Sequence, residues 1–151
     1  MMIVYRRIEW KEFWAFAKPI LEQHYHEIAQ FQDIPLSVDV PRYQQMEAAG
    51  ALRLYTAWNG SHMVGYCAMV VQPNAHYSTS LQAGQDVLYL DPEFRRGRLG
   101  MRLIEFTEEE LKSEGVQVIH QHSKISHPAL GRLLDFLGYT RSDIFHSKRL
   151  Y

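Results

Sequence analysis

The sequence holds a single cysteine in 151 residues, which excludes a fold cross-linked by disulfides within the chain. Cys67 lies in the apolar run 64–71, so we expect it to be a core residue and not a nucleophile. No apolar run approaches the length of a membrane span, and residues 1–10 lack the apolar stretch of a signal peptide. We therefore expect a cytoplasmic protein that does not associate with membranes.

The net charge is also small, because 16 Lys and Arg residues are balanced by 17 Asp and Glu residues, for a formal net charge of -1. This balance argues against a protein that coats nucleic acid or an anionic membrane through its overall field. Repeats, linkers and low-complexity stretches are absent too. Hydrophobic residues make up 46% of the chain, and a chain of this length buries about 68 to 70% of its unfolded surface. We expect one α/β domain over residues 1–151.

The N-terminal part is predicted to form a strand and then helices. The apolar residues of 1–8 favour a strand, and the helical spacing of apolar residues over 9–29 is interrupted by Pro19. That proline predicts either two short helices or one kinked helix. In the next helix, Asp39 stands at the N-cap position and Gly50 lies just past the end.

The rest of the chain is predicted to be rich in strands. Asn59-Gly60 supplies the turn of a hairpin between 52–58 and 62–71. An irregular segment, 72–85, then precedes the best candidate for a buried strand, 86–90. The elements predicted after it are a helix over 99–114, a strand over 116–120, a helix over 128–137 and one or two closing strands over 139–151.

The most informative stretch is 89–104, in which a buried strand runs into a turn rich in arginine and glycine, and a helix begins. Unpaired N–H groups at the helix start, glycines that allow close approach and guanidinium groups together form a site for phosphate or pyrophosphate. Arginines there oppose the helix dipole by about 0.3 to 1 kcal/mol each unless an anion lies between them. The alternative is a surface turn whose arginines pair with Asp91, Glu93 or Glu105.

The spacing of this stretch is that of neither a P-loop nor a Gly-x-Gly-x-x-Gly loop, and it resembles motif A of the GNAT superfamily of N-acetyltransferases. The hydrophobic, proline, aromatic, first and last positions of that motif hold Leu90, Pro92, Phe94, Arg95 and Gly100. Arg98 occupies the first glycine position, and the glycine lies one residue earlier. The resemblance implies an acetyl-CoA site, with main-chain groups for the pantetheine and thioester from Leu88, Tyr89 and Leu90. For the pyrophosphate it implies Arg95, Arg96, Gly97, Arg98, Leu99, Gly100 and Met101.

The resemblance extends along nearly the whole chain and implies a mixed central β-sheet flanked by helices. The run 127–139 is similar to the recurrent ending of these proteins, with two departures. His127 replaces the usual Asn, and Leu134 replaces the Tyr that often protonates the CoA thiolate, so an active enzyme needs another acid. Three segments also look like a phage-borne branch of the superfamily, namely 24–29, 86–93 and 148–150.

The function that the resemblance implies is transfer of an acetyl group from acetyl-CoA to a primary amine by direct attack, with CoA as product. The acceptor would be a small molecule or a protein, and homodimers are common among similar proteins. The alternative hypothesis is a catalytically inactive module of this fold that binds CoA or a protein partner, which Leu134 and the displaced glycine favour. A third hypothesis, acylation of a nucleic-acid base, rests on the arginine cluster alone and is opposed by the neutral composition.

Five residues are candidates for moving protons during the attack. His24 and Glu27 lie three apart on a predicted helix and can share one face, although an exposed helix pair is the alternative. Asp86 opens the predicted central strand, where a carboxylate is costly unless it is paired, functional or at the solvent edge. His76 and Tyr77 precede that strand, with Tyr77 as a candidate substitute acid and packing as the alternative. The eight histidines offer no third ligand at a usable spacing, so no metal site is expected.

Overall fold

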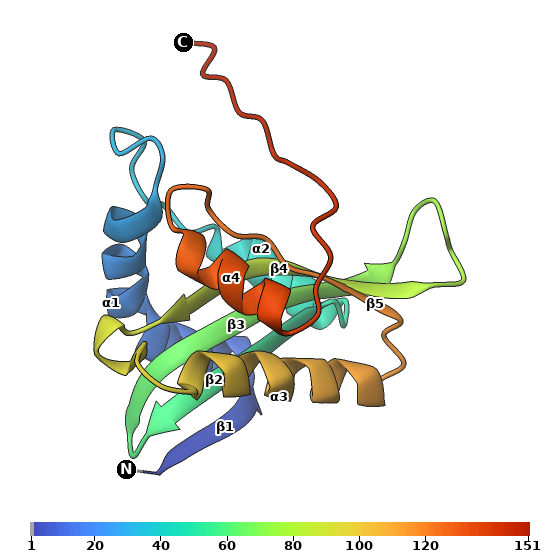
Figure 1. Cartoon of the computed structure of the whole chain (residues 1–151), viewed down its shortest axis with the longest axis horizontal. Coiled ribbons are helices and arrows are strands. Elements are labelled where there is room, and N and C mark those ends of the chain that lie inside the picture. Colours follow the sequence, from blue (N-terminus) through green and yellow to red (C-terminus); the bar gives the residue numbers. More distant parts are fainter. Residues whose placement is uncertain (1) are drawn as a thin grey trace.

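A computed structural model describes residues 2–151 (Figure 1). In chain order the elements are β1 (Ile3–Ile8), α1 (Trp10–Ile28), α2 (Val40–Ala48), β2 (Leu52–Asn59), β3 (His62–Pro73), β4 (Leu81–Leu90), a 3-10 helix η1 (Pro92–Phe94), α3 (Leu99–Ser113), β5 (Val118–His120) and α4 (Pro128–Phe136). One sheet has the strand order β1-β2-β3-β4-β5, with antiparallel pairing up to β4 and parallel pairing between β4 and β5. The predicted mixed sheet flanked by helices is confirmed.

Apolar clusters lie on both faces of the sheet. On one face, α1 and α2 enclose an aromatic cluster that includes Trp10, Phe13 and Tyr66, each at most 4% exposed. The other face packs against α3 through a second cluster, which includes Tyr55 and Cys67. Burial raises the pKa of the Cys67 thiol to about 12. The cysteine is therefore a core residue, as predicted, and remains protonated at neutral pH.

Helix α1 is one continuous helix of 19 residues, although Pro19 lies inside it. A proline in a helix removes a main-chain hydrogen bond, and buried residues on either side, such as Phe13 and His24, keep both halves against the sheet. Of the two alternatives left open by the sequence, the single helix is the one observed. The predicted N-cap of α2 is confirmed, because the Asp39 side chain accepts the N–H of Arg42.

Two hairpins join β2, β3 and β4. The predicted turn at Asn59-Gly60 is confirmed, and its glycine has φ +61. The irregular segment predicted over 72–85 is wrong, because β3 continues to Pro73, β4 begins at Leu81, and the two strands stay paired to these ends. The polar residues of this segment suggest a loop, but they lie in a hairpin that projects beyond the core (Figure 1). Strands that pair there can keep polar side chains in water.

The closing strands predicted over 139–151 are wrong. Residues 140–151 are all exposed and pair with no strand of the described chain. They run as an extended segment from the end of α4 to the C-terminus (Figure 1). Alternation and aromatic residues give a segment the capacity to form a strand, but a strand exists only where another strand supplies hydrogen-bond partners.

β4 contains a bulge, and it separates from β5 after a short paired stretch. The pairing with β3 passes from Gln85 to Val87, so Asp86 forms a bulge inside β4 and does not open the strand as predicted. β5 pairs with β4 only over Gln82–Gly84. On the β5 side, therefore, no strand of the described chain covers residues 85–90 of β4.

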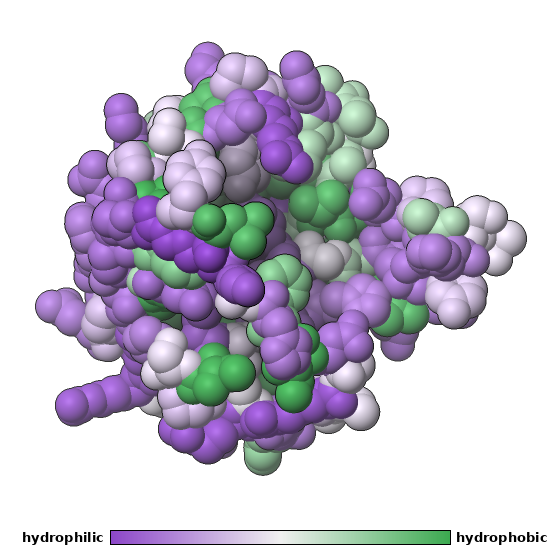
Figure 2. All heavy atoms as spheres, turned by 90° about the horizontal axis from the view of Figure 1, so that it is seen from above, coloured by the Kyte–Doolittle hydropathy of each residue, from purple (hydrophilic) through white to green (hydrophobic). Residues whose placement is uncertain are grey.

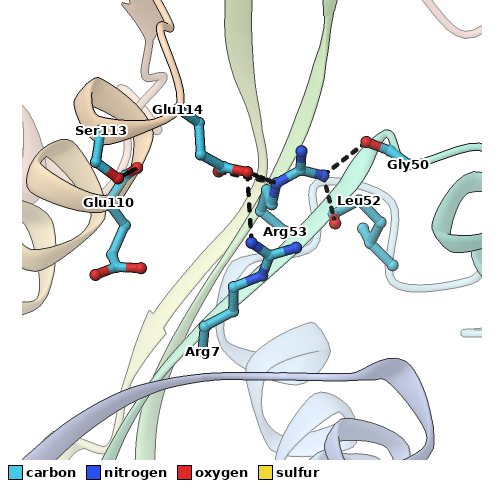
Figure 3. A network of polar contacts seen from close by, with 7 residues as sticks. All are labelled: Arg7, Gly50, Leu52, Arg53, Glu110, Ser113 and Glu114. Carbon is cyan, nitrogen blue, oxygen red and sulfur yellow. Dashed lines mark hydrogen bonds and ion pairs between the residues drawn. The ribbon is translucent and has the colours of Figure 1, made fainter.

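A polar network fixes the C-terminal end of α3 to the sheet (Figure 3). Glu114 is the C-cap residue of α3, and its carboxylate lies 3.0 Å from Nε of Arg53 and 3.5 Å from Nη1 of Arg7. Arg53 also donates to the main-chain oxygens of Gly50 and Leu52. A carboxylate at a helix C-terminus opposes the helix dipole, so the two arginines compensate an otherwise unfavourable charge. The network holds α3 against β1 and β2.

Candidate active site

A cavity of about 650 Å³ lies where β4 and β5 diverge. It is lined by β4 over 85–90, by the last turns of α1, by the start of α3, and by residues between His122 and Leu133. The face of the molecule seen from above in Figure 2 is hollowed near its centre, where apolar residues lie among hydrophilic ones. The cavity thus brings together residues from both faces of the sheet.

The start of α3, where the sequence predicts an anion site, lines one part of this cavity. Gly97 has φ +88, a backbone conformation that favours glycine, and it makes the turn before the helix. The N-cap residue Arg98 makes no side-chain cap hydrogen bond, so the first N–H groups of α3 lack such an acceptor. A Cβ on Gly100 would lie 3.5 Å from Leu90, so the helix start packs closely on the end of β4.

The arginines of the turn divide into two groups. Arg96 and Arg98 are exposed, and within residues 2–151 neither lies within 4.0 Å of an acidic side chain. The alternative in which acidic neighbours of the turn pair with Arg96 and Arg98 is therefore not observed.

The other residues predicted to bind the pyrophosphate differ in where they lie. Gly97, Gly100 and Met101 line the cavity, whereas Leu99 is a core residue.

Arg95 faces α1 and binds Glu27. Its Nη1 and Nη2 donate to the two carboxylate oxygens at 2.5 and 2.8 Å, and its Nε donates to the main-chain oxygen of Leu90 at 2.8 Å. The hydrogen bond from Arg95 holds the pKa of Glu27 below its usual range. Both residues line the cavity. Arg95, a predicted pyrophosphate ligand, is thus paired with Glu27, a predicted catalytic residue 68 positions away.

His24 lies at the inner wall of the cavity and is only 6% exposed. Its Nδ1 shares a hydrogen bond of 2.9 Å with the hydroxyl of Tyr66, and its ring centroid lies 4.6 Å from that of Tyr89. Burial lowers the pKa of His24 to about 4, against a smaller opposing effect of Glu27. His24 is therefore neutral at pH 7. Tyr66 was missed from the sequence because it stands in an apolar run, where an aromatic residue indicates only the core.

Asp86 points from the bulge of β4 toward α2. Tyr43 of α2 donates its hydroxyl to Oδ2 of Asp86 at 2.6 Å, and the Tyr43 ring stacks on Trp10 with centroids 4.7 Å apart. Among the described residues, the other oxygen of Asp86 accepts no hydrogen bond. Tyr43 was missed too, and the sequence carries no signal for it beyond an aromatic residue on a helix.

His76 and Tyr77 do not line the cavity. They lie at the tip of the β3–β4 hairpin, where their N–H groups donate to Asn74, and Tyr77 is 68% exposed. Leu134, at the position where the resemblance implies a tyrosine, is buried at 6% exposure. Tyr89 does line the cavity, and its hydroxyl is buried with no hydrogen-bond partner in the described chain.

Residues 2–151 contain no group of three His, Cys, Asp or Glu side chains arranged to hold a metal ion. None of the helices in this part of the chain is long and apolar enough to cross a membrane.

The fold places the chain in the GNAT class of proteins. The model of the acetyltransferase (GNAT) family matches residues 9–139, and the chain belongs to that family. A comparison with curated proteins gave no match.

Solved structures agree on the fold at low sequence identity. An aminoglycoside acetyltransferase from an uncultured soil metagenomic sample superposes with a TM-score of 0.77 at 14% identity, covering 99% of this chain and 96% of that one. Ribosomal-protein-alanine N-acetyltransferase from Brucella melitensis gives 0.75 at 10%, covering 99% and 100%. A predicted acetyltransferase from Clostridium acetobutylicum, solved with acetyl-CoA, gives 0.73 at 15%, covering 99% and 97%.

Proposed function

We propose that this protein transfers the acetyl group of acetyl-CoA to a primary amine by direct attack, with CoA as product. The observation that carries the proposal is one cavity in which the uncovered edge of β4 adjoins the uncapped start of α3. The edge of β4 would offer main-chain groups to the extended pantetheine of acetyl-CoA. The start of α3 would offer an anion site to the pyrophosphate of the same cofactor. The GNAT family generally uses acetyl-CoA, and the Clostridium acetobutylicum structure is described with it.

The residues of the cavity fit this cofactor. Leu88, Tyr89 and Leu90 lie on the uncovered part of β4 and would bind the pantetheine and the thioester. The helix start over 97–101, with Arg96 and Arg98 beside it, would bind the pyrophosphate. When bound, acetyl-CoA supplies an activated acetyl group. The chain itself must then orient the amine, accept its proton and return one to the thiolate.

Asp86 is the residue we assign to the acceptor amine. Both oxygens of Glu27 are occupied by Arg95, whereas Asp86 has one oxygen held by Tyr43 and one without a donor in the described chain. That free oxygen would hold the ammonium group of the acceptor and take its proton before attack. Within this assignment, Tyr43 orients the carboxylate and the neutral ring of His24 forms the adjoining wall.

Tyr89 is the proton donor we assign to the leaving thiolate, and its phenolate would then take the second proton that the attacking nitrogen loses as the amide forms. Leu134 carries no proton to give, and Tyr77 lies outside the cavity. Burial raises the pKa of Tyr89 above its usual value, so the phenol keeps its proton at neutral pH. Its hydroxyl has no competing partner in the described chain.

The acceptor is a small-molecule or protein amine, and a nucleic acid is not favoured because the net charge of the chain is only -1. The neighbouring aminoglycoside and ribosomal-protein acetyltransferases act on very different acceptors, so a panel must span both kinds. The resemblance to a phage-borne branch and the cytoplasmic location stay predictions.

Two measurements test the proposal. Calorimetric titration with acetyl-CoA and CoA should detect binding, and release of free thiol in the presence of an amine panel should detect turnover. Asp86→Asn should lower kcat/KM by about 10²- to 10⁴-fold, the usual contribution of a general base, and leave acetyl-CoA affinity unchanged. Asp143→Asn, in the exposed C-terminal segment, is the matched control and should keep full activity. Binding without turnover would identify the inactive module, and no binding of either ligand would overturn the proposal.

A further inference from the structure

One lysine of the chain lies in the wall of the candidate active site. The lysines stand at positions 11, 18, 112, 124 and 148, all within the described residues. Lys124 lines the cavity, and the other four do not. It belongs to the segment that leads from β5 to α4. The cavity that we assign to acetyl-CoA thus contains a primary amine of the chain itself.

The main chain is held on both sides of Lys124. The N–H of His122 donates to Oε1 of Gln85, in β4, at 3.1 Å. The N–H of His127 donates to the main-chain oxygen of Lys124 at 3.1 Å and closes the turn before α4. His122 and His127 line the cavity as well. The backbone therefore fixes the point from which the Lys124 side chain starts, while its four-carbon stem stays flexible.

No carboxylate of the described chain holds the amine of Lys124. Within residues 2–151, no acidic side chain lies within 4.0 Å of its Nζ. Arg95, in the same cavity, differs in this respect because both oxygens of Glu27 bind it. Lys124 is also exposed. Its amine is therefore free to move within the cavity and to react there.

The positive charge of Lys124 acts on histidines from two different elements of the cavity wall. Burial is the main reason that the pKa of His24 is lowered, and the charge of Lys124 acts in the same direction. Desolvation is the main reason that the pKa of His122 is lowered, with Lys124 lowering it further and Asp86 raising it. The ring centroid of His24 lies 4.6 Å from that of Tyr89. The amine of Lys124 thus lies close to the part of the cavity in which we place the acceptor and the thioester.

We infer, on the basis of the proposed function, that the chain acetylates its own Lys124 at Nζ. The acceptor in that function is a primary amine, and Lys124 brings one into the cavity on a flexible stem. An amine held in the same site as the thioester has a high effective concentration, which favours transfer within one chain. The amide that forms is no longer a nucleophile, so the reaction stops after one acetyl group on each chain.

The reaction uses the groups already assigned to the external acceptor. The ammonium of Lys124 gives a proton to Asp86, and Nζ then attacks the carbonyl carbon of the thioester. A C–N bond forms and the C–S bond breaks. Tyr89 protonates the leaving thiolate, and its phenolate takes the second proton that Nζ loses. The products are Nε-acetyl-Lys124 and CoA, with one proton left on Asp86 for release to water.

Mass spectrometry of the full chain tests the site. Incubation with acetyl-CoA and no added amine should raise the intact mass by one acetyl group, about 42 Da, and peptide mapping should place it on Lys124. Lys124→Arg keeps the charge and should remove the label. Lys112→Arg, in the last turn of α3 and outside the cavity, is the matched control and should keep it. Acetyl groups spread evenly over the five lysines would indicate chemical acetylation and would overturn the inference.

The rate of labelling tests the mechanism. With acetyl-CoA in excess, the first-order rate constant should not change when the protein is diluted about tenfold, because the amine and the bound thioester belong to one chain. A rate constant that rises with protein concentration would indicate transfer between chains and would overturn the inference. Asp86→Asn should slow labelling by about 10²-fold or more, and a rate equal to that of the wild type would equally count against it.

Self-acetylation and the proposed function can fail separately. Turnover of the amine panel while Lys124 stays unlabelled would overturn self-acetylation and leave the proposed function in place. An absence of acetyl-CoA binding in calorimetry would overturn both, and the calorimetric result identifies that case.

Discussion

Arg95 and Glu27 form a two-pronged ion pair that joins the end of β4 to the last turns of α1. The guanidinium is held at a third point by the main-chain oxygen of Leu90 and lies 5.4 Å from the ring centroid of Tyr89. Because its donors toward Glu27 are used, we propose that Arg96 and Arg98 bind the pyrophosphate and that Arg95 does not. The pair instead fixes one wall of the cavity.

This division of the arginines predicts different effects for two alanine variants. Arg96→Ala should weaken acetyl-CoA binding by about 1.5 to 3 kcal/mol, the usual worth of a hydrogen bond to a charged group. Arg95→Ala should leave that affinity nearly unchanged and should instead raise the pKa of Glu27, because the hydrogen bond that lowers it is lost. Calorimetry measures the first effect, and an NMR titration of the Glu27 carboxyl carbon measures the second. Equal losses of affinity in both variants would contradict the division.

The turn before α3 and the start of that helix could be predicted because their signals are local. A strand residue, a proline, arginines and glycines follow one another within residues 89–104, and α3 begins at Leu99, as predicted. The bond between Tyr43 and Asp86 spans 43 positions, and it depends on how α2 crosses the sheet. No spacing rule connects such residues, so the sequence offers Asp86 as a candidate and gives no sign of its partner Tyr43.

The two incorrect predictions of secondary structure, for 72–85 and 139–151, also depend on contacts between segments that the sequence pattern does not show. The polar segment before β4 lies in a hairpin, because its strands pair with each other and need no core. The alternating segment 139–151 forms no strand within the chain, because no neighbour pairs with it. An alternating pattern of side chains shows that a segment can form a strand. Whether a neighbouring strand is there to pair with it depends on how the elements are arranged in space.

Tyr43→Phe should lower kcat/KM and leave acetyl-CoA affinity unchanged. The phenol donates to the Asp86 carboxylate at 2.6 Å, and the variant removes this contact, which orients the carboxylate. The loss in kcat/KM should be about tenfold, because a hydrogen bond to a charged group contributes about 1.5 kcal/mol. The stacking of the ring on Trp10 is kept in this variant. Tyr77→Phe, at the exposed hairpin tip, is the matched control, and equal kcat/KM values for the two variants would argue against Tyr43 as a positioning residue.

Gly65→Ala should destabilise the fold next to the cavity. An added Cβ would lie 2.7 Å from Cδ1 of Leu90 and 3.1 Å from the main-chain oxygen of Tyr89, so the Leu90 side chain would have to move and the main chain of β4 would have to give way where it leads into the turn before α3. Overpacking of this kind costs about 1 to 3 kcal/mol. Gly84→Ala is the control in the same pair of strands, because its Cβ would meet nothing within 4 Å. Urea unfolding of both variants checks the difference, and equal stabilities would show that the contact at Gly65 relaxes freely.

His24 should make the stability of the protein fall with pH below neutrality. Its folded pKa is lowered from the usual 6.5 to about 4, mainly by burial. Over that window the unfolded chain binds a proton that the folded chain does not, so stability is fully present above pH 6.5 and declines as pH falls toward 4. Between pH 7 and pH 5 this amounts to about 2 kcal/mol of unfolding free energy. Urea unfolding at the two pH values measures it. His24→Gln should remove about that much of the pH dependence, whereas His76→Gln, at the exposed hairpin tip, should keep the wild-type slope. An identical slope in His24→Gln and wild type would show that His24 is not held neutral by the fold.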